Sequence, residues 1–221
     1  FFTQLPAPPG EPGGGVANAI VGTILITLLA TALGVPIGLA AGVYLAEFGR
    51  DSRFATLTRF LSSVLMGMPS IIIGVFVYTL LVVRTHRFTG YAGAVALAVI
   101  MLPVIARTTE EMLHLVPNAL REAALALGAP RWQATLGIVV RAARSGLLTG
   151  ILLAVARVSG ETAPLLFTSL NSPYWVESLD APTANLTVTI FNYAMSPYEN
   201  WSGAVSRSEE HTSELQSLTD I

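Results

Sequence analysis

The sequence predicts an all-α protein, a polytopic bundle of membrane-spanning helices. The first observation is composition: 52% of the 221 residues are hydrophobic and 12% are charged, against roughly 25% charged residues in soluble domains. The second is that the apolar residues gather into long runs. So few charges do not cover a globular surface in water, whereas a lipid bilayer solvates long apolar helices.

Four apolar runs are candidate spans. A helix needs roughly 20 residues to cross a bilayer. The four runs occupy approximately residues 17–46, 60–83, 91–106 and 146–167. Glycine and proline lie inside them, and we expect Pro36 to kink the first. Membrane helices tolerate such residues because neighbouring helices satisfy the freed backbone groups.

Arginine distribution predicts the orientation of these spans, because basic connections stay on the cytoplasmic side. The basic residues of the first and third connections are Arg50, Arg53, Arg59, Arg107, Arg121, Arg131, Arg141 and Arg144. The segment after the fourth span, residues 168–206, has none. We therefore expect residues 107–145 to be cytoplasmic, and residues 1–16 and the loop after the fourth span to lie outside.

The third connection contains a candidate docking hairpin. Its apolar residues recur at helical spacing: Leu120, Ala123, Ala124 and Leu127. This spacing predicts one apolar stripe, with Asn118 as the N-cap. Gly128 is expected to end the helix and Pro130 to begin the next. Such a helix suits insertion into a partner's cleft, although a helix lying on the membrane surface has the same pattern.

The hairpin also carries a recognisable motif. Glu122, Ala123 and Ala124, followed by three residues and Gly128, resemble the EAA-xxx-G signature of ABC-importer permeases. In that family the loop forms the coupling helix, which sits in a cleft of the ATPase subunit. The resemblance implies the type I ABC-importer permease fold and a coupling role for these four residues. The sequence departs from the family at Arg141, where a proline usually follows the aliphatic run.

A wider resemblance covers the chain up to about Val205. Residues 102–113, 160–168 and 189–197 resemble the phosphate permeases of the PstA type. The resemblance implies a transmembrane domain over residues 17–206 that moves inorganic phosphate across a bacterial or archaeal inner membrane by alternating access. Permeases of this type have about six spans, so we expect the first and last to be missing here.

The resemblance further implies a set of partners. They are an ATP-binding cassette ATPase dimer, a second, PstC-like permease subunit, an extracytoplasmic phosphate-binding protein and membrane lipid. Nucleic acid is not expected, because the net charge is −2. The sequence has no lysine, which a P-loop requires, and no cysteine. We therefore expect no catalytic site, cofactor or metal in this chain, with ATP and magnesium bound by the partner ATPase.

Two charged residues interrupt the fourth apolar run and are candidates for the substrate pathway. A charge at the membrane centre costs from about 3 to more than 10 kcal/mol, so Arg157 and Glu161 need a partner or a water-filled path. Four residues apart, they share one helix face. Arg157 suits phosphate because guanidinium presents a planar fork of donors; a permanent structural salt bridge with Glu161 is the alternative.

Two further residues are included in the predicted pathway. Thr162 offers a hydroxyl donor beside Glu161, although threonine more often joins helices in membranes. Arg107, at the expected end of the third span, would bind phosphate at the exit or simply anchor the helix on the cytoplasmic side.

The segments expected outside the membrane are candidates for contact with the binding protein. They are residues 1–16 and the loop 169–201, whose aromatic residues also suit a membrane-interface belt. Residues 207–221 are polar and acidic, and RSEEHTSELQS within them resembles a translated sequencing-library adapter. We expect this tail to be non-native; a native disordered tail is the alternative.

Three other functions remain open on the sequence alone. A permease for sulfate, molybdate or an organic solute would differ in its pathway residues. An ATP-independent transporter or channel would leave the EAA motif unexplained. A purely structural membrane subunit would tolerate an apolar residue in place of Arg157.

Overall fold

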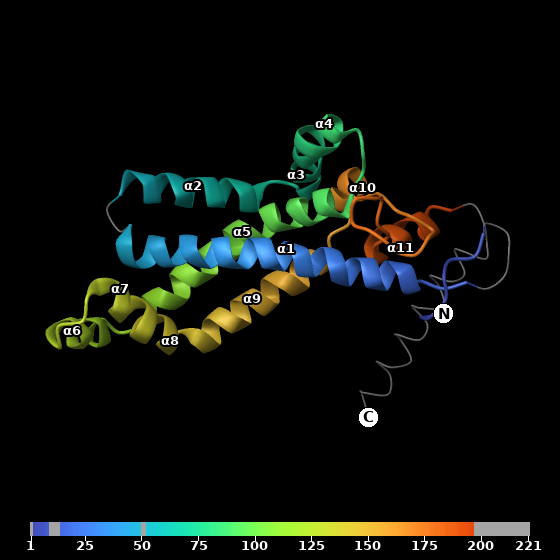
Figure 1. Ribbon diagram of the computed structural model, residues 1–221. Coiled ribbons are helices and arrows are strands. Elements are labelled where there is room, and N and C mark those ends of the chain that lie inside the picture. Colours follow the sequence, from blue (N-terminus) through green and yellow to red (C-terminus); the bar gives the residue numbers. More distant parts are fainter. Residues whose placement is uncertain (1, 9–13, 50–51, 197–221) are drawn as a thin grey trace, which may run out of the picture. The chain divides into compact units, whose positions relative to one another are not determined.

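A computed structural model describes residues 2–8, 14–49 and 52–196, so the expected non-native tail, residues 207–221, lies outside the described residues. Every regular element in these ranges is a helix, which confirms the predicted all-α class (Figure 1). The α-helices are α1 Ala17–Val43, α2 Arg53–Gly67, α3 Ser70–Val77, α4 Val83–Thr85, α5 Gly90–His114, α6 Asn118–Ala126, α7 Arg131–Ala134, α8 Val140–Ala142, α9 Arg144–Ser159, α10 Ala163–Thr168 and α11 Leu186–Ala194. Three π-helical segments continue helices: η1 Tyr44–Phe48, η2 Tyr78–Val82 and η3 Thr135–Val139.

Two of the described helices are long and apolar enough to cross a membrane. They are Ala17–Phe48, which joins α1 to η1, and α5. The first matches the expected span. The second is longer than expected at its end: Arg107 to His114 continue the helix instead of starting the connection. Two bent helix pairs bring the number of candidate spans to four if each pair is one span.

The second expected span, residues 60–83, is not one helix. α2 ends at Gly67 and α3 begins at Ser70. Met68, between them, has an extended backbone with φ −79° and ψ 140°. The cause is Pro69, because its ring disfavours the helical conformation in the preceding residue. The prediction of a continuous span was wrong at this point.

The fourth expected span, residues 146–167, is broken as well. α9 ends at Ser159, and Gly160 caps it by donating its N–H to the carbonyl of Arg157. α10 starts afresh with Pro164 in its first turn, where a missing N–H does no harm. α9 instead forms a bent pair with the helix that precedes it, Arg131–Ala142, with an angle of 71° at the break.

The chain divides into two compact units, of which one comprises residues 27–73 and 94–161. α5 runs through this unit, and its Leu97, Met101 and Ile105 are almost completely buried. Glycines let neighbouring helices approach α5 closely. A Cβ added to Gly42 of α1 would lie 2.5 Å from Thr109 Cβ, and one added to Gly150 of α9 would lie 2.5 Å from Thr108 Cγ2. Small residues at such contacts are typical of membrane helix packing.

The other unit comprises residues 2–8, 14–26, 74–93 and 162–196 of the described chain. The segment between α10 and α11 and the first residue of α11 are held here by hydrogen bonds to α1. The Asn18 Nδ2 group donates to the Ser172 carbonyl at 2.8 Å, and the Leu186 N–H donates to Thr23 Oγ1 at 2.8 Å. Asn185 caps α11 through its side-chain oxygen, which accepts from the Val188 N–H.

Candidate functional site

A small cavity holds both charged residues that the sequence singled out. Its volume is about 100 Å³, and Arg157 and Glu161 line it together with Met66, Met68 and Ser70 from the break between α2 and α3. α5 contributes Ile100 and Val104. The interruption of two expected spans, at Pro69 and after Ser159, thus supplies most of the polar lining of this cavity.

Arg157 and Glu161 share the cavity but not a helix face. Arg157 is exposed in the last turn of α9, whereas Glu161 follows the end of that helix and is half-buried. The expectation that both lie on one face of one helix was wrong, because α9 ends at Ser159. Within the described ranges the Arg157 guanidinium makes no hydrogen bond or ion pair. It therefore presents its full set of donors.

The two remaining predicted pathway residues lie apart from the lining of this cavity. Thr162 follows Glu161 directly, is half-buried and precedes α10. Arg107 lies on the surface of α5, where its Nε donates to Glu111 Oε1 at 2.8 Å; both side chains are exposed. An exposed pair of this kind is worth only about 0–1 kcal/mol, so it is easily exchanged for another partner.

The hairpin begins at α6 and turns at Gly128. Gly128 has a φ of +81°, its N–H donates to the Leu125 carbonyl, and the Ala129 N–H donates to the Ala124 carbonyl. This pair of bonds around a left-handed residue is the Schellman motif that ends helices, so the predicted role of Gly128 in ending the helix is confirmed. The predicted N-cap was wrong by one residue: Pro117 precedes α6, and Asn118 is its first residue.

The residues of the predicted apolar stripe are not all on one side of the hairpin: some are buried and others are exposed. Ala124 is buried, with 3% of its surface exposed. Leu127 at the turn is 89% exposed, and Trp132 and Leu120 are also exposed. Glu122 and Ala123 of the EAA motif face outward as well. The tip therefore presents bare apolar side chains beside one carboxylate, and only Ala124 of the motif packs inside the hairpin.

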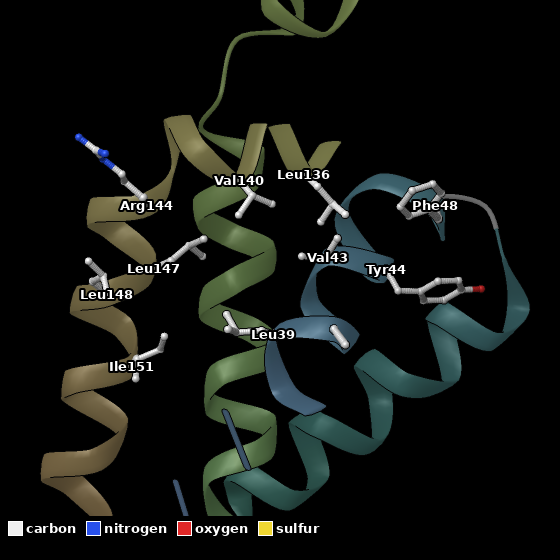
Figure 2. Close-up of a pocket in the computed structure, with 11 residues that line it drawn as sticks. Leu39, Val43, Tyr44, Phe48, Leu136, Val140, Arg144, Leu147, Leu148 and Ile151 are labelled. Atoms are coloured by element: carbon white, nitrogen blue, oxygen red, sulfur yellow. The ribbon is translucent and has the colours of Figure 1, made fainter. Parts of the chain in front are cut away.

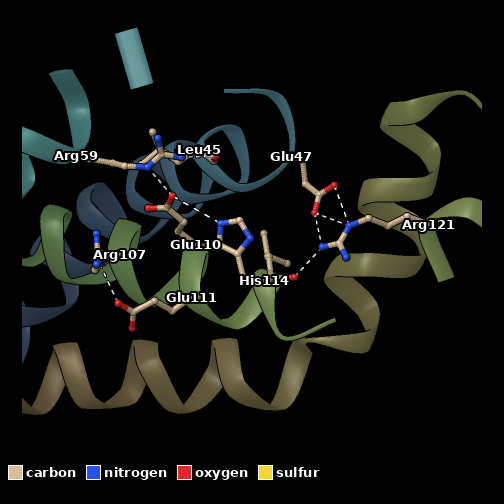
Figure 3. Close-up of polar contacts among 9 residues, drawn as sticks. Leu45, Glu47, Arg59, Arg107, Glu110, Glu111, His114 and Arg121 are labelled. Carbon is tan, nitrogen blue, oxygen red and sulfur yellow. Dashed lines mark hydrogen bonds and ion pairs between the residues drawn. The ribbon is translucent and has the colours of Figure 1, made fainter. Parts of the chain in front are cut away.

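Two partly buried ion pairs in the same unit were not predicted (Figure 3). Arg59 of α2 donates through Nε to Glu110 Oε1 of α5 at 2.7 Å. Arg121 of α6 donates through Nη2 to Glu47 Oε1 of η1 at 2.7 Å. Sequence reasoning used Arg59 and Arg121 only for orientation. Their partners lie 51 and 74 residues away, a separation that no local pattern reveals.

An apolar groove of about 670 Å³ lies between the end of α1 and the start of α9 (Figure 2). Leu39, Val43, Leu136 and Leu147 line it, and the Arg144 side chain at its rim points away from them. It lacks donors directed inward and does not suit an oxyanion. Across the described ranges, no three His, Cys, Asp or Glu side chains gather closely enough to hold a metal ion.

Comparison with known proteins identifies the class of protein. The family of inner membrane components of binding-protein-dependent transport systems matches residues 34–196, and the chain belongs to this family. The phosphate transport system permease protein PstA of Yersinia pestis is 54% identical over 201 residues, which are 91% of this chain and 68% of that protein. PstA of Haemophilus influenzae is also 54% identical over 201 residues, 91% of this chain and 71% of that protein.

Solved structures confirm the fold. A chain of the MetNI methionine ABC transporter in an inward-facing conformation aligns with a TM-score of 0.63 at 18% identity, covering 93% of this chain and 91% of that chain. A chain of an amino acid ABC transporter aligns with a TM-score of 0.58 at 17% identity, covering 92% and 91%. The ABC-importer permease fold expected from the EAA motif is therefore correct.

Proposed function

We propose that this chain is the membrane-spanning permease subunit of an ATP-driven importer, and that inorganic phosphate is its substrate. The observation that carries the proposal is the hairpin α6–α7. It presents the EAA motif and a bare apolar tip, with Leu127 89% exposed, in a chain that belongs to a binding-protein-dependent transport family. A short helix with an exposed apolar tip suits a groove on a partner.

Phosphate as substrate is supported by the relatives and by the charged cavity. The relatives that match most of the chain are named phosphate transport system permeases. Arg157 offers an unpaired planar fork of donors to phosphate oxygens. Ser70, which lines the same cavity, begins α3, and a helix N-terminus favours anions.

Glu161 gives the cavity a counter-charge to Arg157. A carboxylate lining the same small space offsets the guanidinium charge and weakens the hold on an anion. Weak binding suits a transport site, from which the substrate must leave again. Thr162 would supply a hydroxyl beside it, and Arg107, whose surface pair with Glu111 is readily exchanged, would meet phosphate where it leaves the pathway.

Energy for transport would come from a partner. The hairpin, on the cytoplasmic side, would dock into a dimeric ATP-binding cassette ATPase that binds ATP and magnesium. Closure of that dimer would move Glu122, Ala123, Ala124 and Gly128 together and rock the spans between outward and inward openings. A second, PstC-like permease subunit would complete the pathway, and a phosphate-binding protein would deliver substrate to the outer segments, residues 1–16 and 169–201.

Uptake measurements test the proposal. The permease is co-expressed with the ATPase and the binding protein encoded beside it, and purified complexes are reconstituted into liposomes. We expect accumulation of labelled phosphate that requires ATP and that excess sulfate or molybdate does not suppress. Competition by those oxyanions would assign another cargo. Accumulation without ATP, in complexes that contain no ATPase, would refute the importer class.

A further inference from the structure

Arginine side chains from two different helices donate hydrogen bonds to η1, the π-helical segment that continues α1 (Figure 3). Arg59 of α2 donates through Nη2 to the Leu45 carbonyl at 3.0 Å, while its Nε holds Glu110 of α5 at 2.7 Å. Arg121 of α6 donates to the Glu47 carboxylate. Segments of π-helix are often found at functional sites and at helix bends.

The second of these contacts is the more extensive. Arg121 approaches Glu47 through both Nε and Nη2, at 3.0 and 2.7 Å from Oε1. The same guanidinium donates to the backbone carbonyls of Leu113, in the last turn of α5, and Val116, which follows that helix. The Arg121 side chain is 13% exposed and that of Glu47 is 9% exposed. One side chain thus joins α6 to both α1 and α5.

Arg121 also makes the polar contacts that hold α6 to the rest of this unit. Among the described residues, every side-chain hydrogen bond that α6 makes outside the hairpin comes from Arg121. A cavity of about 300 Å³ lies beside this side chain; its lining includes Glu47, Arg121, Glu122 and Thr135. At this cavity the Arg121–Glu47 pair bridges α6 and η1.

We propose that the Arg121–Glu47 ion pair is the link through which movement of the coupling hairpin reaches α1, with both residues acting as positioning residues for transport. The inference rests on the proposed function. Arg121 precedes the motif residue Glu122 directly, so it moves with the surface that meets the ATPase. Breaking the pair should leave ATP hydrolysis running while the spans no longer follow it.

The test compares phosphate imported with ATP hydrolysed, in proteoliposomes that contain the assembled importer. Arg121→Lys keeps the charge but loses the fork that reaches Glu47 and two carbonyls together. Glu47→Gln keeps the shape but loses the charge. Coupling between sites is typically worth about 5- to 150-fold. We expect both variants to import about tenfold less phosphate per ATP, with hydrolysis retained.

Arg141→Gln is the matched control, since Arg141 is exposed and makes no hydrogen bond or ion pair in the described part of the chain. It should keep the wild-type ratio. A wild-type ratio in both test variants would overturn the inference, and so would a parallel loss of hydrolysis and import, which indicates a merely structural pair. Failure of the proposed function looks different, because the wild-type complex itself would then import no phosphate.

Discussion

At the scale of single residues, the charged cavity separates what the sequence predicted from what it did not. Arg157 and Glu161 stood out because they interrupt an apolar run, and the structure places both on one cavity. Their shared helix face was wrong, because Gly160 and Pro164 end one helix and start another. Met66, Met68 and Ser70 line the same cavity, and the sequence indicated a packing point near the pathway at these residues.

Replacing Arg157 by glutamine removes the cation and keeps a polar side chain of similar reach. A hydrogen bond to a charged group is worth roughly 1.5–3 kcal/mol, so apparent phosphate affinity in ATP-driven uptake should fall about 10- to 150-fold. The phosphate affinity of Arg157→Lys should lie between those of the wild type and Arg157→Gln, because an ammonium keeps the charge without the planar fork.

Uptake kinetics at varied phosphate concentration give these affinities, with Arg141→Gln as the variant that should be unaffected. Unchanged uptake in Arg157→Gln would mean that this arginine never meets the substrate and would favour the purely structural alternative.

At the scale of elements, local signals predicted the turn of the hairpin, whereas the helix breaks at Pro69 and Gly160 and the contacts between helices were missed. Gly128 predicted the turn of the hairpin, because a left-handed residue ends a helix locally. Pro130 directly precedes α7 instead of beginning it. Gly34 and Gly38 flank Pro36 in α1. The structure packs them against α5: a Cβ on Gly38 would lie 2.9 Å from Ile105 Cβ. Glycines four residues apart indicate such close packing equally well.

Gly42→Ala tests this packing. The added Cβ would lie 2.5 Å from Thr109 Cβ and 2.6 Å from the Ala106 carbonyl oxygen, so α1 and α5 must separate. Overpacking of this kind typically costs about 1–3 kcal/mol, and thermal unfolding of the purified complex should shift to lower temperature.

Gly137→Ala is the control for that experiment, since nothing lies within 4 Å of its added Cβ. A thermal shift of the same size in both variants would contradict close packing of α1 on α5, because only Gly42 is enclosed.

At the scale of the whole molecule, exposure of the hairpin tip is the feature that a folded partner would explain. In a membrane protein, apolar residues on the spans are covered by lipid. The helix Ala17–Phe48 fits this, since only 28% of its most apolar stretch is buried, against 67% for the corresponding stretch of α5. Leu127 lies instead at the turn that follows α6, and Trp132 lies on the short helix α7. Polar and charged residues surround both in the sequence. A folded partner that covers them accounts for both the motif and the exposure.

A cross-link from the hairpin tip tests this most directly. The sequence has no cysteine, so Leu127→Cys introduces a single reactive thiol, 89% exposed at the wild-type residue. Leu152→Cys on α9, where the leucine is 68% exposed, is the control expected to face lipid. In inner membranes with the importer assembled, we predict that a thiol-specific cross-linker joins the Leu127→Cys variant, but not the Leu152→Cys variant, to an ATP-hydrolysing subunit. No adduct from the hairpin tip in an intact complex, or labelling of that tip by an impermeant reagent from outside the cell, would contradict the account.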